Sequence, residues 1–307
     1  MRVLFWGTPQ FAVPPLRALI GEGFEVCGVV TQPDKPQGRS RTIVPPPVKV
    51  VALEEKLPVF QPETPKDKEF EQMFQLMQPD ISIVVAYGHI LPKRIIDFPR
   101  LGTLNIHASL LPALRGAAPI QAAIRNGLTE TGVSIMRMVP ALDAGPVLLT
   151  SRTPILPDET YGELRERLAE VGALALIEAL ALLDLGEAKE TLQDDALATY
   201  AAKVTRDTAR IDWHQPAAAV SCAIRAYDPQ PGAFTTLRDA DVKLFGANVV
   251  SDHHAPPGTV LPLSDRLVIA CAEGAVVIQD VQPSGKRRMA AADWLRGRGV
   301  VAGDRFV

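Results

Sequence analysis

The sequence predicts an α/β fold, in which a mostly parallel sheet with helices on both faces is followed by a small β-barrel domain. Residues 3–30 have a strand–helix–strand pattern, the start of a βαβ unit. Apolar strands and helical segments keep alternating up to a long helical pattern at 160–183. From residue 233 onwards, short strands recur at roughly ten-residue spacing, which is typical of a small barrel. A chain of 307 residues is most simply two domains.

The first domain, residues 1–184, is predicted to be Rossmann-like, with its elements in the following chain order. Strands are expected at 3–6, 26–30, 59–60, 81–85, 104–107, 132–138 and 147–151. Helices are expected at 11–22, 48–55 and 66–77, then a short one ending at 97, one beginning at Pro119 and the long one at 160–183. Only one glycine, Gly7, follows the first strand, so the Gly-x-Gly-x-x-Gly fingerprint of a nicotinamide-dependent dehydrogenase is absent.

A polar, irregular stretch at 185–208 is predicted to be a linker, and residues 209–307 to form the second domain. In that domain a helix is expected at 216–225, strands at 233–237, 242–246, 259–263, 267–270 and 275–281, and a helix at 290–295. These strands predict a small, OB-like barrel.

Two segments concentrate positive charge, although the net charge of the chain is only -3. The loop at 32–47 contains five prolines, and residues 35–49 contain four basic side chains and no acid. Residues 284–307 contain six basic side chains and two acids, a surplus of +4. Both are candidate phosphate-facing patches, and the alternative is that each is a solvated surface.

The strongest candidate for a functional site is the end of the strand at 104–107. Asn105 and His107 alternate with Leu104 and Ile106, so both polar side chains are predicted to point to one side of the sheet. A loop follows, and polar residues at the carboxyl end of a strand are well placed to bind ligands. The alternative is a structural, hydrogen-bonded Asn-x-His pair.

A second candidate is Asp143, which lies in a Gly/Pro-rich bend between two apolar strands. By itself this pattern indicates a turn.

Together these motifs resemble the folate-dependent formyltransferases. The matching residues are Gly7-Thr8-Pro9, the Thr31–Arg39 run TQPDKPQGR, Val85-Ala-Tyr-Gly88, Asn105-x-His107, Ser109-Leu-Leu-Pro112-x-x-Arg115-Gly116-x-x-Pro119-Ile120, Leu142-Asp143-x-Gly145, Ala209-Arg-Ile-Asp-Trp213 and Ile224-Arg-Ala226. Each motif is weak alone, but their order and spacing are specific, and they extend over nearly the whole chain.

The resemblance implies an enzyme that moves the formyl group of 10-formyltetrahydrofolate to the free amino group of methionyl-initiator tRNA, for translation initiation. In such acyl transfer an amine attacks the formyl carbon and an oxyanion develops, which requires hydrogen-bond donors and a proton carrier. Asn105 and His107 are the expected donors. Asp143 is expected to stabilise the charged imidazolium and to hold a water that carries protons. No metal is required.

The resemblance also implies binding residues. The folate is expected to contact Ser109, Leu110, Leu111, Pro112, Tyr87, Gly88, Ile90, Leu91 and Val139. The tRNA is expected to contact Lys35, Arg39 and Arg41 in the basic loop, and Lys286, Arg287 and Arg288 in the second domain, which would hold the tRNA backbone. For Ile90 and Leu91, core packing is the alternative. Ala113-Leu114 and Ala144 depart from the commonest family pattern.

The cysteines and the apolar segments of the sequence indicate the cellular compartment. Cys27, Cys222 and Cys271 are far apart and are expected to be small core residues in a reducing compartment. The apolar run at 173–185 contains Glu178 and Asp184 and is too short to span a membrane. The chain begins directly with a strand pattern instead of a signal peptide. We therefore expect a cytoplasmic enzyme, and a monomer.

Other functions remain open at this point. Sugar-nucleotide formyltransferases and formyltetrahydrofolate hydrolases share the catalytic trio and can carry a similar second domain, whereas phosphoribosylglycinamide formyltransferase is essentially one domain. A Ser-His-Asp hydrolase would need Ser109 as its nucleophile, but the Gly-x-Ser-x-Gly elbow is absent. The remaining alternative is an RNA-binding protein with a degenerate enzyme domain.

Overall fold

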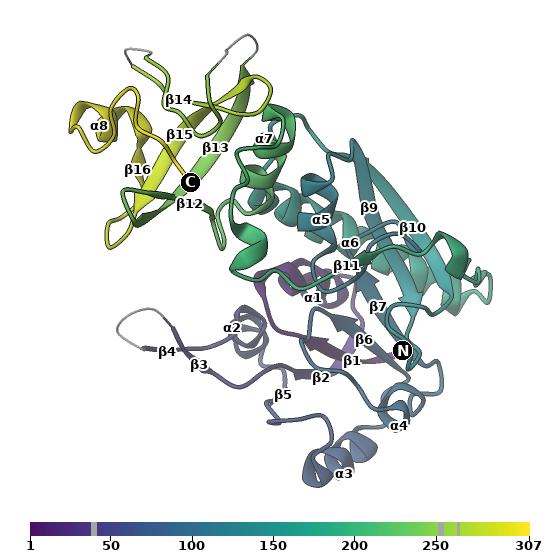
Figure 1. Cartoon of the computed structure of the whole chain (residues 1–307). Coiled ribbons are helices and arrows are strands. Elements are labelled where there is room, and N and C mark those ends of the chain that lie inside the picture. The colour runs from purple at the N-terminus through teal and green to yellow at the C-terminus, as the bar shows by residue number, and fades with distance from the viewer. Residues whose placement is uncertain (38–41, 251–254, 263–264) are drawn as a thin grey trace. The chain divides into compact units, whose positions relative to one another are not determined.

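The computed structural model describes residues 1–37, 42–250, 255–262 and 265–307 (Figure 1). The chain divides into two compact units. The first comprises residues 1–116, 132–153 and 165–200, and the second comprises 117–131, 154–164 and 201–307.

The first unit is built on a sheet of seven described strands in the order β10-β9-β7-β6-β1-β2-β5. The strands are β1 (Arg2–Gly7), β2 (Glu25–Val30), β5 (Val59–Phe60), β6 (Ile81–Val85), β7 (Thr103–His107), β9 (Glu130–Arg137) and β10 (Val147–Pro154). The neighbours from β5 to β7 are all parallel, whereas β9 is antiparallel to β7. The predicted Rossmann-like, mostly parallel sheet is therefore confirmed.

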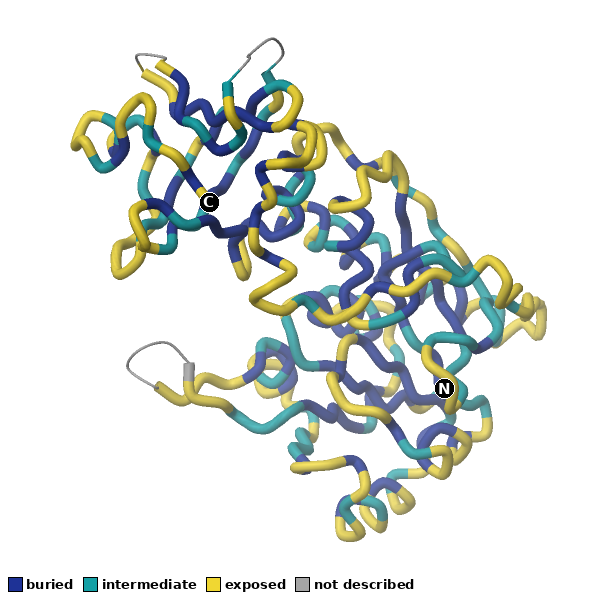
Figure 2. The backbone as a smooth tube through the Cα atoms, in the orientation of Figure 1, coloured by how far each residue is buried: buried dark blue, intermediate teal, exposed yellow. Residues whose placement is uncertain are grey.

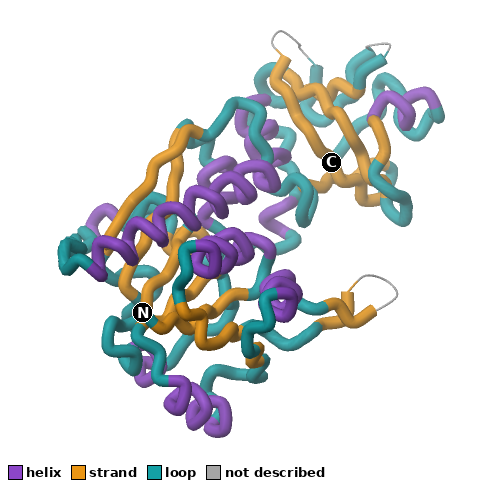
Figure 3. The backbone as a smooth tube through the Cα atoms, turned by 180° about the vertical axis from the view of Figure 1, so that it is seen from behind, coloured by secondary structure: helices purple, strands orange, loops and turns teal. Residues whose placement is uncertain are grey.

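Helices pack on both faces of this sheet. They are α1 (Val13–Gly21), which follows the short turn η1 (Gln10–Ala12), α2 (Pro47–Glu54), α3 (Lys68–Met77), α4 (Lys93–Ile96) and most of α6 (Tyr161–Asp184). On one face, α3 and α4 share an apolar cluster with Trp6 and Val84. On the other face lies α6, which is seen from behind in Figure 3. A Cβ on Gly172 of α6 would lie 3.0 Å from the side chain of Ile106, so glycine permits this close approach. Figure 2 shows that the strands of the sheet are largely buried.

Two short pairings accompany the main sheet. β3 (Lys35–Gln37) and β4 (Thr42–Val44) form an antiparallel pair inside the segment that was expected to be a long loop. β8 (Arg115–Gly116) pairs with β11 (Tyr200–Ala201). The stretch predicted to be an irregular linker thus contributes a strand, together with the short turns η2 (Asp195–Leu197) and η3 (Asp207–Ala209).

The second unit contains a mostly antiparallel sheet in the order β12-β13-β15-β14, in which β16 also pairs with β15. Its strands are β12 (Ala233–Leu237), β13 (Ala240–Val250), β14 (Leu267–Ala270), β15 (Ala275–Pro283) and β16 (Met289–Ala290), and its helices are α5 (Pro119–Arg125), α7 (Ala217–Ala226) and α8 (Ala291–Arg296). The Ser221 hydroxyl of α7 donates to the carbonyl of Ala247 in β13 and so ties this helix to the sheet. Buried side chains that include Trp213, Trp294 and Phe306 form one core.

Two elements of this unit differ from the sequence prediction. β13 continues through Gly246, where the strand was expected to end, because glycine adopts the positive φ of 59° found there. The strand expected at 259–263 is reduced, within the described residues 259–262, to isolated bridges from Thr259 to Arg305 and from Val260 to Ile269. Pro262 has no N–H with which to extend a ladder.

Candidate active site

The candidate site lies where the order of the parallel strands reverses. From β1 the chain adds β2 and β5 on one side and then β6 and β7 on the other, and these parallel strands end at Gly7, Val85 and His107. In open α/β sheets, ligands bind at this carboxyl edge beside the reversal point. The alternation in the sequence had therefore placed Asn105 and His107 at a suitable position.

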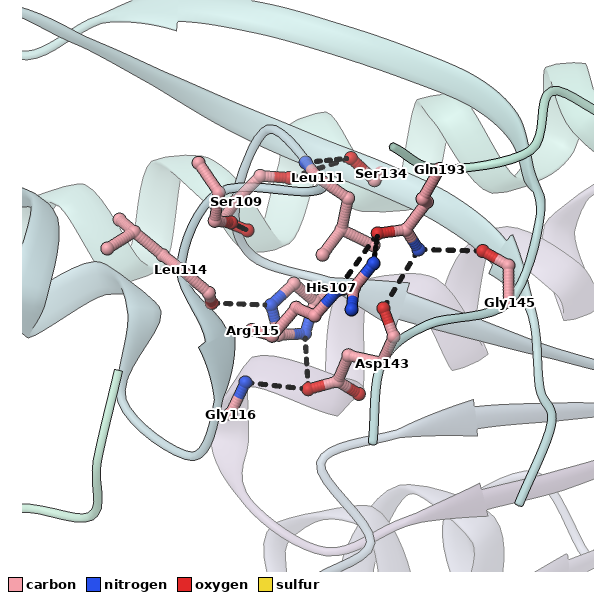
Figure 4. A network of polar contacts seen from close by, with 11 residues as sticks. His107, Ser109, Leu111, Leu114, Arg115, Gly116, Ser134, Asp143, Gly145 and Gln193 are labelled. Carbon is pink, nitrogen blue, oxygen red and sulfur yellow. Dashed lines mark hydrogen bonds and ion pairs between the residues drawn. The ribbon is translucent and has the colours of Figure 1, made fainter. Parts of the chain in front are cut away.

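His107 is held between a backbone carbonyl and a carboxylate (Figure 4). Its side chain is buried, with Nε2 3.0 Å from the carbonyl oxygen of Leu114 and Nδ1 3.7 Å from Oδ2 of Asp143. Because a carbonyl only accepts hydrogen bonds, Nε2 carries a proton in this arrangement. Nδ1 is therefore the ring nitrogen that can exchange a proton.

The position of Asp143 depends on an unusual backbone. Asp143 has a positive φ of 47°, which aspartate tolerates better than most residues. Its Oδ2 accepts a hydrogen bond of 2.7 Å from the N–H of Gly116. Two residues later, a Cβ at Gly145 would lie 1.7 Å from the carbonyl oxygen of Arg137, so only glycine fits there. The structure thus brings Asp143 to His107, as the resemblance implied.

Asn105 has the free hydrogen-bonding capacity that a ligand-binding amide requires. In register, Asn105 pairs with Val84 and Met136, and the strand alternation puts it on the same face as His107. Its side chain is half-buried, and its amide forms no hydrogen bond with any residue in the described part of the chain. This observation is against the alternative of a purely structural, mutually bonded pair.

Ser109 is turned away from the histidine. Its hydroxyl, in a residue that is only 1% exposed, donates to the carbonyl of Ala113 over 2.6 Å. Its own carbonyl accepts from the hydroxyl of Ser134, which also accepts from the N–H of Leu111. The nucleophile–base hydrogen bond of a Ser-His-Asp hydrolase is therefore absent between Ser109 and His107.

The residues predicted to bind folate differ in their exposure. Leu110, Leu111 and Pro112 follow β7 and are half-buried, as is Val139. Ile90 is 86% exposed and Gly88 is exposed. By contrast, the side chains of Tyr87 and Leu91 lie in the apolar core, where the Tyr87 ring centroid is 5.3 Å from that of Trp6. Burial raises the pKa of Tyr87 to about 12. The backbone carbonyl of Tyr87 accepts hydrogen bonds from Thr8 and Gln32.

The residues predicted to bind tRNA also have different environments. Arg39 and Arg41 lie outside the described residues. Lys35 is exposed and its ammonium group donates to the side chain of Gln32. Lys286 and Arg287 are exposed, whereas Arg288 forms ion pairs with two aspartates.

Several hydrogen bonds around the site were not anticipated from the sequence. Arg115, only 3% exposed, donates to Oε1 of Gln193 and to Asp195, and Gln193 in turn donates to carbonyls in the bend that carries Asp143. The hydroxyl of Thr199 accepts a hydrogen bond from the N–H of Leu114. The polar segment 185–208 lacks the periodicity that would have indicated this role.

This arrangement suits acyl transfer between a donor and an amine. Asn105 can donate to a developing oxyanion, and so can Nδ1 of His107 once it is protonated. Nδ1 lies 3.7 Å from Oδ2 of Asp143, so a carboxylate faces this nitrogen. Among the described residues, no group of three or more His, Cys, Asp or Glu side chains could hold a metal ion. A search of the described helices finds none with the length and apolar character needed to cross a membrane.

Comparison with protein families gives two matches. The formyl transferase model matches residues 1–180, and the model of the formyl transferase C-terminal domain matches residues 203–299.

Individual relatives match over nearly the whole chain. The methionyl-tRNA formyltransferase of Methylococcus capsulatus is 47% identical over 307 residues, which cover 100% of this chain and 99% of the relative. The methionyl-tRNA formyltransferase of Moorella thermoacetica is 44% identical over 306 residues, with coverages of 99% and 98%.

Solved structures of lower identity share the fold. HypX from Aquifex aeolicus in complex with tetrahydrofolic acid has a TM-score of 0.65 at 22% identity, covering 96% of this chain and 47% of HypX, so this chain spans about half the length of that protein. WlaRD, a sugar 3N-formyl transferase, has a TM-score of 0.68 at 17% identity, covering 94% and 99% of the two chains. Matching family models over both parts of the chain, and relatives at 44–47% identity, show that the chain belongs to the formyl transferase family.

Proposed function

We propose that this protein transfers the formyl group of 10-formyltetrahydrofolate to the free amino group of methionyl-initiator tRNA, giving formylmethionyl-tRNA for translation initiation. The proposal is supported by the relatives of the same length that bear the name methionyl-tRNA formyltransferase. The single structural observation that carries the chemistry is the buried His107 between a carbonyl and Asp143, beside Asn105, whose amide forms no hydrogen bond with the described residues.

The reaction requires one bond to form and one to break. The amino nitrogen of the methionyl group attacks the formyl carbon, and the carbonyl oxygen gains negative charge. Asn105 and the Nδ1–H of His107 donate to that oxygen. The attacking amine loses a proton, and N10 of the folate gains one as the carbon–nitrogen bond breaks. Asp143 stabilises the imidazolium and holds a water through which these protons move.

The folate is proposed to lie along the segments 109–112 and 86–91 and the bend containing Val139. What supports this is the combination of the exposed Ile90 and Gly88 with the half-buried Leu110, Leu111 and Pro112. The side chains of Tyr87 and Leu91 lie in the core, so these two residues would contact folate through their backbone or would only pack beneath the residues that contact it.

The tRNA is proposed to be bound by basic side chains of the loop around Lys35, Arg39 and Arg41 and by Lys286 and Arg287 in the second domain. We further propose that this domain, residues 209–307 after a linker at 185–208, is an OB-like barrel. Supporting observations are its five-stranded sheet and the isolated bridges that join residues 259 and 260 to Arg305 and Ile269. The enzyme is proposed to act in the cytoplasm, where its tRNA substrate is used, and as a monomer.

Sugar-nucleotide amines and water are the alternative acceptors. The test supplies 10-formyltetrahydrofolate with methionyl-initiator tRNA, with methionyl-elongator tRNA, with a dTDP-aminosugar, or with no acceptor. We expect formyl incorporation into the initiator tRNA alone. Release of formate without acceptor would instead identify a hydrolase, and formylation of the aminosugar alone would identify a sugar enzyme.

A variant separates catalysis from binding in the same assay. His107→Ala is expected to lose most turnover and to keep its affinity for tRNA, and His214→Ala serves as a control because His214 is exposed in the second unit. If His107→Ala kept the turnover of the wild type, the proposed mechanism would be contradicted.

A further inference from the structure

One short segment touches both groups that hold the catalytic imidazole. Residues 193–199 lie in the stretch that was predicted to be a linker. In the structure they belong to the first unit, which also contains the candidate site. Gln193 is at one end of this segment and Thr199 at the other. Neither contacts His107 itself, but each bonds the backbone of a residue that does.

Gln193 fixes the bend that carries Asp143. Its Nε2 donates to the carbonyl of Asp143 over 2.8 Å and to that of Gly145 over 2.7 Å (Figure 4). Its Oε1 accepts from Nε and Nη2 of Arg115 at 3.1 and 2.8 Å. The amide is therefore fully used, and its orientation is fixed because the guanidinium can only donate. Arg115 is itself anchored by Asp195 at 2.7 Å.

Thr199 fixes the other partner of the imidazole. Its hydroxyl accepts a hydrogen bond of 2.9 Å from the N–H of Leu114, whose carbonyl accepts from Nε2 of His107. Its carbonyl accepts from the N–H of Arg115, and its N–H donates to the carbonyl of Pro112. Thr199 is thus bonded to Pro112, Leu114 and Arg115 of this loop.

These contacts matter because both partners have unfavourable backbone conformations. Leu114 has a φ of 58° and Asp143 a φ of 47°. A non-glycine residue in this region is strained by its Cβ and persists only where its surroundings hold it. Without such restraint, the carbonyl of Leu114 and the carboxylate of Asp143 would relax away from the ring.

We infer that the segment 193–199 is a positioning element of the active site, in which Gln193 and Thr199 set the orientation and the proton-bearing nitrogen of His107 through Asp143 and Leu114. This inference rests on the proposed formyl transfer. In the absence of the bond from Nε2 to the Leu114 carbonyl, the ring can rotate and either nitrogen can carry the proton. With the bond in place, Nδ1 alone faces Asp143 and the reacting groups.

The test compares substitutions that differ in one hydrogen-bonding group. Thr199→Val removes the hydroxyl with little change of shape, and Thr199→Ser retains it. Gln193→Glu keeps an acceptor for Arg115 but replaces the donor that serves two carbonyls. Thr191→Val is the matched control, because Thr191 is exposed two residues before this segment and its described hydrogen bonds are made by its backbone.

The full-length enzyme is assayed for kcat and for KM toward both substrates. We expect kcat to fall about ten- to hundredfold in Thr199→Val and Gln193→Glu, as when a supporting partner shifts a reacting group by about 1 Å. KM should stay within about twofold, and Thr199→Ser and Thr191→Val should resemble the wild type. In Gln193→Glu the loss of kcat should come without a change of shape, because glutamate retains the size of glutamine but cannot donate to the carbonyls of Asp143 and Gly145.

Three results would overturn this inference. One is a kcat of Thr199→Val equal to that of Thr191→Val, another is a kcat of Gln193→Glu equal to that of the wild type, and the third is a rise of KM at constant kcat. Formyl transfer by the wild-type protein is measured in the same series. Failure of the proposed function would abolish that reference activity, whereas failure of this inference would leave it intact.

Discussion

The basic run at 286–288 contains residues with different structural roles, and substituting Arg288 tests this difference. The guanidinium of Arg288 bridges two carboxylates, with Nη1 2.9 Å from Oδ1 of Asp228 and Nε 2.9 Å from Oδ2 of Asp280. It also lies 4.2 Å from the ring centroid of Phe245. The sequence suggested a phosphate contact here, whereas these contacts indicate that Arg288 stabilises the second unit.

The loss of stability expected in Arg288→Ala follows mainly from the burial of Asp228, whose side chain is 7% exposed. Without Arg288, this carboxylate keeps one described donor, the N–H of Gly246 at 3.1 Å. Removing one partner of a buried ion pair typically costs about 3–5 kcal/mol. The side chain of Arg288 is 39% exposed, so water can replace part of this interaction. Allowing for that, and for about 0.5 kcal/mol from the Phe245 contact, we expect Arg288→Ala to lower the unfolding free energy by about 3 kcal/mol.

The assay is equilibrium denaturation of the full-length variants, followed through the tryptophans, combined with tRNA affinity as a function of salt. Arg287 is exposed and its side chain forms no hydrogen bond or ion pair in the described part of the chain, so Arg287→Ala should change stability by less than about 0.5 kcal/mol. If Arg287 contacts a phosphate, its loss should reduce the salt slope of tRNA binding by about 0.7–0.9.

Arg288→Lys provides a further control. A lysine ammonium is a point charge that cannot reproduce the two-sided contact of a guanidinium fork. We expect a stability between those of the wild type and Arg288→Ala. If Arg288→Ala and Arg287→Ala unfold at the same denaturant concentration, the structural role assigned to Arg288 is wrong.

Three further predictions concern the first unit. His107→Ala and Asp143→Asn should each lower kcat about 10²–10⁴-fold, the usual contribution of general acid–base groups, and an unchanged kcat in a formylation assay would disprove the roles given to them. Gly145→Ala should both destabilise the protein and lower kcat, because its Cβ would meet the carbonyl of Arg137; a thermal melt identical to that of the wild type would contradict this. Tyr87→Phe should be neutral or stabilising at pH 7, because the buried hydroxyl has no partner among the described residues. Since burial raises the pKa of Tyr87 from 10.0 to about 12, the folded state retains a proton that the unfolded state loses, so stability should fall as the pH rises above about 10. That fall should be smaller in Tyr87→Phe, and equal pH dependence of the two denaturation midpoints would refute it.

Much of the fold could be predicted because it depends on local patterns. Buried strands such as Ile81–Val85 are short apolar runs, and the long helix α6 repeats its apolar residues at helical spacing. Where local chemistry permitted an alternative, the prediction differed from the structure. Gly246 could have ended β13 but carries it onwards with a positive φ, and the run after Gly258 forms only isolated bridges before Pro262.

The sequence by itself indicated which residues belong to the candidate site. The strand alternation predicted that Asn105 and His107 share a face, in agreement with the register of β7. The resemblance to the folate-dependent formyltransferases implied that Asp143 belongs with them, whereas the sequence around Asp143 indicated only a turn.

Only the tertiary structure decided which atoms of these residues face one another. That Nε2 of His107 is bonded to the carbonyl of Leu114, and that Nδ1 faces Asp143, depends on two residues with positive φ. Gln193 bonds the backbone of Asp143 from 50 positions away, and Thr199 bonds that of Leu114 from 85 positions away. Single hydrogen bonds from an irregular segment leave no periodic signal in the sequence, because they depend on one donor meeting one carbonyl in the folded chain.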